Sequence, residues 1–152
     1  MLSLAQGGDG RPEVTDLSEA VRKFAAGLGR DVGEGVQLTI EPAQGRLPVR
    51  LDAGLLELVL LNLVRTAASA MPDGGTVMLR TCGPRLDGLG DQLATELSVS
   101  DSGAGMLQDK DTELGLRIAH QFASTHGGKI KVETKPGLGT IVSLSLPYAE
   151  DA

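Results

Sequence analysis

Two stretches of this 152-residue sequence carry residue types that could hold a nucleotide. D-S-G-A-G-M at 101–106 places a carboxylate before two glycines, whose turn would let the backbone approach a ligand closely. L-G-L at 114–116 runs into an expected helix, and amides at a helix N-terminus attract phosphate. Between these stretches stand Asp111 and Glu113, whose charge would repel phosphate. The pattern therefore indicates either a working nucleotide site or the remains of one.

A polar stripe runs along the most apolar expected helix, 52–71. Its members Asn62, Arg65, Thr66 and Ser69 share an arc of about 100° at helical spacing. The arc could be the solvent face of the helix. Alternatively, Asn62 and Thr66, one turn apart, face a cleft together, because an asparagine within an apolar helix is costly unless something bonds to it.

Hydrophobic periodicity predicts the elements that must position these residues. Residues 84–91 are expected to form a loop, and residues 1–15 to be loosely ordered. The succession of elements predicts an α+β fold, a two-layer sandwich with helices on one face of a mixed, mostly antiparallel sheet. The expected helices span 17–30, 52–71 and 114–125, and the expected strands span 36–42, 46–52, 76–82, 92–101, 129–134 and 140–147.

Composition excludes several function classes. A net charge of −6 and an aromatic content of 2% disfavour nucleic-acid binding, which needs basic surface and often stacking platforms. No run approaches the roughly 18 apolar residues of a membrane span, so membrane contact is not expected. The single cysteine, Cys82, lies in an apolar run and is expected to be a buried free thiol. A lone cysteine fits a reducing compartment, so the expected location is cytoplasmic.

Three segments in order resemble the ATP-binding (CA) domain of sensor histidine kinases. These are V-R-L-D…G-G-T-V at 49–77, V-S-D-S-G-A-G-M at 99–106 and L-G-L-R…S-L-P at 114–147, which includes H-G-G and P-G-L-G-T. The resemblance covers residues 16–149 and implies the Bergerat (GHKL, HATPase) fold shared with gyrase, a mismatch-repair ATPase and a heat-shock chaperone. Residues 1–15 resemble a linker or the tail of a preceding helical dimerisation domain.

The resemblance implies an adenine pocket around Asp101. In the family, the matching aspartate accepts a hydrogen bond from the adenine amino group, aided by a threonine that matches Thr140, and a carboxylate suits this because it only accepts. Gly103 and Gly105 would let the backbone turn beside the base, and Met106 would offer an apolar wall. Without the resemblance, Asp101 could simply be a turn residue at a strand end.

The phosphate end departs from the family pattern. Asn62 matches the first asparagine of the family's N box and is the one metal ligand expected, whereas Thr66 replaces the second, which binds magnesium. A threonine hydroxyl is shorter than a carboxamide, and magnesium demands near-ideal geometry.

The family's second glycine box, G-x-G-L-G-L, is also altered. Two of its three glycines have become Asp111 and Glu113, while Gly115 and Leu116 remain. Alternatively, Asp111 or Thr112 would make a good helix N-cap, and acids suit a first turn. The family's lid loop is reduced to 107–110.

Two functions stay open at this stage. The first is a degenerate ATP-binding domain of two-component signalling that binds ATP or ADP weakly, with the departures counting against magnesium. It would act by docking a response regulator receiver domain or a helical dimerisation domain. The alternative is an active domain that transfers the γ-phosphate of ATP to a histidine elsewhere. No catalytic residue is assigned, because neither His120 nor His126 has the phosphoacceptor context and Asn62 stands where related ATPases carry a glutamate.

Overall fold

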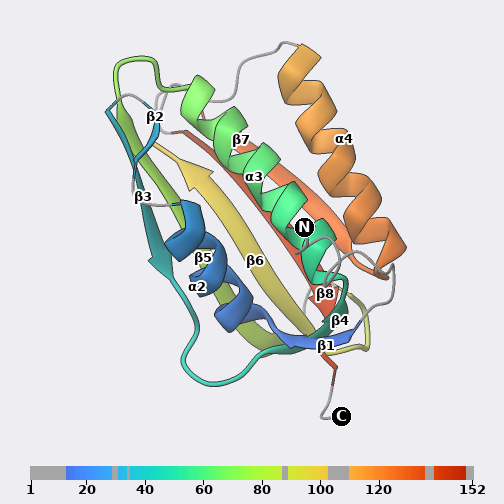
Figure 1. Ribbon diagram of the computed structural model, residues 1–152. Helices are drawn as coiled ribbons and strands as arrows, with labels where there is room; N and C mark the ends of the chain where they lie inside the picture. Colours follow the sequence, from blue (N-terminus) through green and yellow to red (C-terminus); the bar gives the residue numbers. More distant parts are fainter. Residues whose placement is uncertain are drawn as a thin grey trace.

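The computed structural model describes residues 13–28, 31–33, 35–86, 89–102, 110–135 and 139–149. Its helices α2 (Leu17–Leu28), α3 (Ala53–Ser69) and α4 (Lys110–Thr125) lie side by side over one face of a sheet, with α3 in the middle (Figure 1). The sheet has six strands in the order β2-β3-β5-β6-β8-β7. These strands are β2 (Asp31–Gly33), β3 (Val36–Glu41), β5 (Gly75–Arg85), β6 (Ala94–Asp101), β7 (Lys129–Lys135) and β8 (Gly139–Pro147).

This architecture confirms the predicted two-layer fold. β3 pairs with β5 in parallel, and the other neighbouring pairs of the sheet are antiparallel, so the sheet is mixed and mostly antiparallel as expected. Among the described residues, no helix is both long enough and apolar enough to cross a membrane.

The core lies between the sheet and α3. Alternate residues of β6 and β8, such as Leu97 and Leu144, are fully buried beneath the helices. Leu60 and Leu63 of α3 are fully buried as well. Buried side chains recur at every second residue along the strands and about every 3.6 residues along the helix. Each element therefore turns one face toward the core and away from water. Asp52 caps α3, because its Oδ1 accepts hydrogen bonds from the backbone N–H groups of Gly54 (2.9 Å) and Leu55 (3.3 Å).

A second, two-stranded ribbon pairs the strand before α2 with the strand before α3. β1 (Glu13–Asp16) pairs antiparallel with β4 (Pro48–Leu51), so the expectation of loose order was wrong for residues 13–15, and residues 1–12 lie outside the described residues. Asp16 joins the ribbon to α2, since its Oδ1 accepts from the N–H groups of Ser18 (3.2 Å) and Leu47 (3.0 Å).

Two element boundaries also differ from expectation. β5 continues to Arg85, although a loop was expected from residue 84, and its pairing with β6 shifts register between Cys82 and Arg85. α4 begins at Lys110 rather than Leu114, because the acidic turn before the apolar pattern is itself helical.

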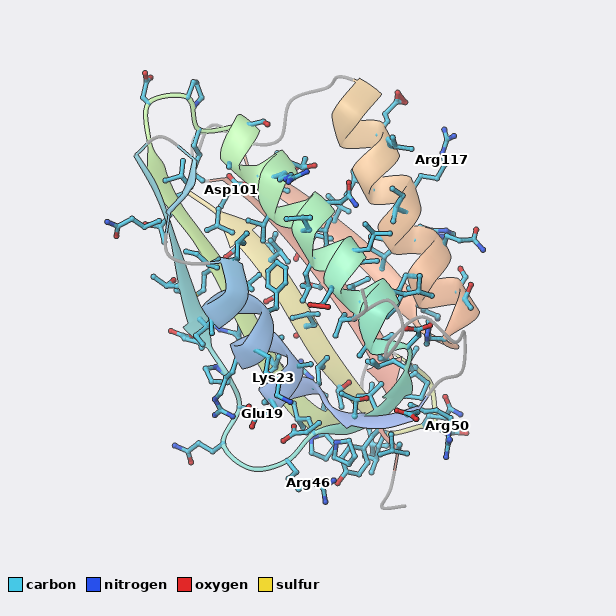
Figure 2. All side chains as sticks on the ribbon, viewed as in Figure 1. Glu19, Lys23, Arg46, Arg50, Asp101 and Arg117 are labelled. Carbon is cyan, nitrogen blue, oxygen red and sulfur yellow. The ribbon has the colours of Figure 1, made fainter. Side chains whose placement is uncertain are left out.

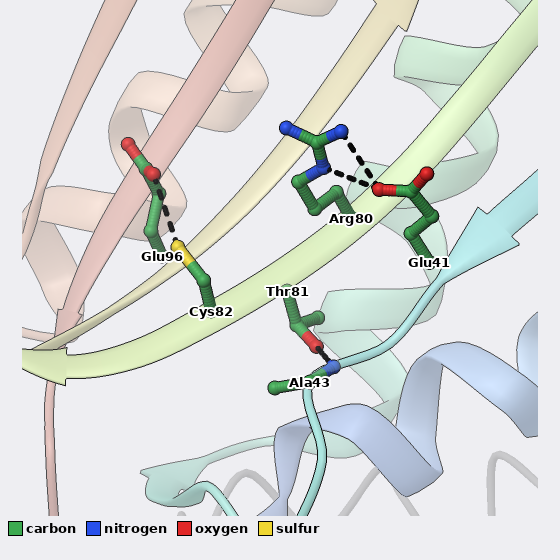
Figure 3. Close-up of polar contacts among 6 residues, drawn as sticks. All are labelled: Glu41, Ala43, Arg80, Thr81, Cys82 and Glu96. Carbon is green, nitrogen blue, oxygen red and sulfur yellow. Dashed lines mark hydrogen bonds and ion pairs between the residues drawn. The ribbon is translucent and has the colours of Figure 1, made fainter.

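The face of the sheet away from the helices carries polar cross-strand pairs (Figure 3). Glu41 Oε1 lies 2.7 Å from Arg80 Nη2 and 2.8 Å from Arg80 Nε, and this pair joins β3 to β5. Cys82 is a free thiol as expected, but it is half-buried rather than buried. Its thiol donates to Glu96 Oε1 at 3.4 Å, and partial burial raises the pKa of Cys82. On the helix side, Thr81 Oγ1 accepts from Ala43 N–H at 2.9 Å.

Candidate functional site

Asp101, around which the adenine pocket is expected, is the last residue of β6 (Figure 2). The residue is only 6% exposed and pairs with Val77 of β5. Thr140 at the start of β8 is fully buried, and its Oγ1 lies 3.2 Å from Thr134 Oγ1. Because Ser100 pairs with Ile141, the antiparallel register brings Asp101 and Thr140 to the same end of adjacent strands.

Gly139 shows why this corner needs a glycine. Its φ is 113°, and a Cβ at this position would overlap the backbone carbonyl oxygen of Asp101. An alanine would therefore push β8 away from the strand end that carries Asp101. The close approach holds the two buried polar residues of the corner together.

Ser102 is an anchoring residue that the sequence analysis missed. Its Oγ accepts from Thr76 N–H at 3.1 Å and lies 3.5 Å from Met71 Sδ. These contacts tie the start of the D-S-G-A-G-M segment to β5 and to the turn after α3. The signal available was a serine directly after a strand-end acid, a common position for side-chain bonds to backbone. The predicted site residues Gly103, Gly105 and Met106 lie outside the described residues.

The polar arc of α3 divides into two parts. Arg65 and Ser69 are exposed, and Ser69 Oγ donates to the Arg65 carbonyl at 3.0 Å, so this part is solvent face. Asn62 and Thr66 are half-buried. The Asn62 amide Nδ2 donates to the Leu58 carbonyl oxygen at 2.9 Å, so the amide group has a partner within its own helix.

Thr66 and Gly115 bring α3 and α4 into close contact. A Cβ placed on Gly115 would lie 3.0 Å from Thr66 Oγ1 and 3.9 Å from the Asn62 carbonyl oxygen. Gly115 is buried, and Leu116 beside it packs against the core. The structure therefore assembles the residues expected at the phosphate end, Asn62, Thr66, Gly115 and Leu116, on two neighbouring helices.

The first turn of α4 carries the two acids. Asp111 and Thr112 lie inside the helix rather than at its N-cap, because the helix begins at Lys110. Glu113 is exposed. Acidic side chains in a first turn stabilise a helix by about 0.3–1 kcal/mol, through the same positive end that would otherwise attract phosphate. Acids at these positions therefore stabilise the start of α4.

The described donors do not reproduce a magnesium site of the family type. Thr66 supplies a hydroxyl that packs against α4, and Asn62 supplies the one carboxamide. Magnesium prefers several oxygens at near-octahedral positions. Asn62 and Thr66 alone do not supply such a set of oxygens.

His126 bridges the end of α4 and the start of α3. Its Nδ1 lies 2.8 Å from the Phe122 carbonyl oxygen, and its Nε2 lies 3.4 Å from the Asp52 backbone nitrogen. The first contact requires a proton on Nδ1, and the second requires a lone pair on Nε2, so the geometry fits the neutral Nδ1–H tautomer. The ring thus links the C-terminal end of α4 to the residue that caps α3.

Comparison with known proteins shows the family. The family model described as histidine kinase-, DNA gyrase B-, and HSP90-like ATPase matches residues 51–150, about two thirds of the chain. The chain belongs to this ATPase family. Its match includes α3, Asp101, α4 and the β7–β8 hairpin, the elements that carry the site residues described above.

Relatives of this family member are sensor kinases. The chain is 34% identical to the sensory histidine kinase/phosphatase NtrB of Rhodobacter capsulatus, over 90% of this chain and 43% of that protein. It is 31% identical to the sensor kinase CckA of Brucella abortus, over 90% of this chain and 17% of that protein. The chain therefore spans less than half the length of these relatives. It is an ATP-binding domain of the histidine-kinase type, the class used in two-component signalling.

Solved structures show the same fold. The catalytic domain of histidine kinase ThkA, in a nucleotide-free form, superposes with a TM-score of 0.72 at 21% identity, covering 90% of this chain and 95% of that one. Full-length ShkA in complex with AMPPNP gives a TM-score of 0.71 at 23% identity, covering 98% of this chain and 34% of that one. These likenesses confirm the GHKL sandwich.

Proposed function

We propose that this domain is a degenerate member of the family, which binds the adenine end of ATP or ADP weakly and acts through protein interaction. The observation that carries the proposal is the acidic first turn of α4, where Asp111 and Glu113 replace two glycines of the phosphate-binding box. A carboxylate there repels the triphosphate and occupies the helix end that would stabilise it.

The adenine end supports retained recognition of the base. Asp101 is nearly buried beside the buried Thr140, and a strand-end carboxylate in such a corner can accept from an exocyclic amine. Gly139 keeps the two strands close enough to hold that corner. Adenosine and ADP are therefore expected to bind about as well as ATP.

The interaction role follows from the domain class. The chain spans 43% of NtrB and 17% of CckA, so such proteins have room for other domains with which this one could interact. The proposed partners are a response regulator receiver domain and a helical dimerisation domain. The proposed domain occupies residues 16–149, with 1–15 as a linker or the tail of the dimerisation domain. The proposed location is the cytoplasm.

The alternative is an active domain that passes the γ-phosphate of ATP to a histidine on a separate dimerisation domain. Gly115 and Leu116 of the glycine box and Asn62 of the N box favour it, since all three lie where the two helices meet. Phosphoryl transfer depends mainly on positioning and charge neutralisation, and the acids of α4 oppose the second.

Restoring the family residues tests the proposal. The triple variant Thr66→Asn/Asp111→Gly/Glu113→Gly is expected to bind MgATP at least about tenfold more tightly than the parent, since unit charges about 8 Å apart in water interact by about 0.5 kcal/mol per pair. The charge-only variant Asp111→Asn/Glu113→Gln should recover part of that gain. Glu133→Gln on β7 is the matched control, because it removes an exposed acid on another element. Unchanged MgATP affinity in the triple variant would count against the proposal.

A further inference from the structure

A groove runs between α2 and α3, apart from the nucleotide site. Two cavities of about 470 Å³ and 430 Å³ share Lys23, Phe24 and Glu57, so they form one continuous depression, here called the α2–α3 groove. One end is bounded by β1 and by the start of α3 at Ala53, and the other end reaches Leu61.

The floor of the groove is apolar. Phe24, Leu56 and Leu60 are core residues that form its base. Leu58 on its wall is 50% exposed, a large apolar side chain that folding leaves in water. Burying such surface is worth roughly 25 cal/mol per Å², so a partner with matching apolar side chains would be stabilised there.

The rim of the groove is acidic. Glu13, Glu19 and Glu57 are all exposed, and none of the three forms an ion pair with another residue of the described part of the chain. Lys23 is the cation that lines the groove, and Figure 2 shows it beside Glu19 on α2. Three carboxylates against one ammonium attract a cationic ligand and repel phosphates, which disfavours nucleic acid and anionic lipid.

We propose that the α2–α3 groove binds an amphipathic, basic polypeptide segment of a partner protein. The wall from Ala53 to Leu61 is about 12 Å long at 1.5 Å per residue, which matches two to three turns of a helix. Its apolar side chains would lie on Phe24 and Leu58, and its lysines or arginines would face the three carboxylates. The inference rests on the proposed interaction role, but not on the fate of the nucleotide site.

Peptide binding to the full chain tests the inference. The probe is a 14-residue helical peptide with leucines at i, i+3, i+4 and i+7 and lysine at its other positions, and its counterpart carries glutamate in place of lysine. Backbone amide NMR shifts should move in 13–28 and 53–61 with the lysine peptide only. The double variant Glu19→Lys/Glu57→Lys should weaken binding about tenfold, and Leu58→Ser about fivefold, at low salt.

Matched controls separate the groove from general attraction to an acidic protein. Glu133→Lys changes an exposed acid on β7, and Leu86→Ser removes a 62% exposed leucine, and both should leave the affinity unchanged. Equal weakening by a groove variant and its control would overturn the inference, as would shifts confined to the sheet.

The same NMR measurement also tests two other occupants of the groove, a second copy of the protein and residues 1–12 of the chain itself. Shifts in the groove that grow with protein concentration, without peptide, would assign it to a second copy and overturn the proposal. Shifts there on removing residues 1–12 would assign the groove to the chain's own start, which would overturn the proposal as well. ATP titration of each sample reports on the nucleotide site separately, so either proposal can fail alone.

Discussion

Adding one methyl group at Gly115 tests whether α3 and α4 meet as described. Alanine inside a helix is favoured over glycine by about 0.8–1.0 kcal/mol. The new Cβ would lie 3.0 Å from Thr66 Oγ1, however, and overpacking of this kind costs about 1–3 kcal/mol. We therefore expect Gly115→Ala to be between neutral and about 2 kcal/mol less stable than the parent. In a Thr66→Ala background the contact is absent, and the same change should stabilise by about 1 kcal/mol.

Urea unfolding of the four proteins of this double-mutant cycle measures the coupling. A coupling energy of about 1–3 kcal/mol is expected, because the two residues touch directly. Gly27→Ala is the control, since Gly27 also lies in a helix but nothing stands within 4 Å of its added Cβ, so it should only stabilise. A stabilising Gly115→Ala with coupling below about 0.5 kcal/mol would refute the contact between the N-box and glycine-box positions.

Two further predictions concern Asp101 and Cys82. Asp101→Asn should weaken adenosine binding at least about tenfold, since a hydrogen bond to a charged group contributes about 1.5–3 kcal/mol, and equal binding by a variant with an unchanged circular dichroism spectrum would mean that the pocket lies elsewhere. Burial raises the pKa of the Cys82 thiol above its ordinary 9.0. Because the thiolate is the form that reacts, iodoacetamide should alkylate Cys82 slowly at pH 8 and faster only above pH 9. Fast alkylation of the folded protein at neutral pH would contradict that environment.

The fold could be predicted wherever burial imposed a clear period. L-S-V-S of β6 alternates apolar and polar residues, and the long apolar run of α3 begins at a capping aspartate, so both elements were found. β1 and the short β2 were missed, because four and three residues carry too little pattern. The start of α4 was missed because D-T-E has no apolar periodicity, although its acids stabilise a first turn.

The site could be predicted less completely than the fold. The resemblance named Asp101 and Thr140, and strand register explains why they share a corner. Periodicity placed Asn62 and Thr66 on one arc, but it could not show that the Asn62 amide bonds to the carbonyl of Leu58 or that Thr66 faces Gly115. Such contacts depend on rotamers and on helix packing. Ser102 was missed for the same reason.

Calorimetric titration of the protein with ATP, with and without magnesium, tests the central claim most directly. ADP and adenosine serve as comparison ligands that shorten or remove the anionic tail. The account predicts weak binding that is nearly indifferent to magnesium and similar for the three ligands. Tight ATP binding that requires magnesium and is lost with adenosine would contradict it.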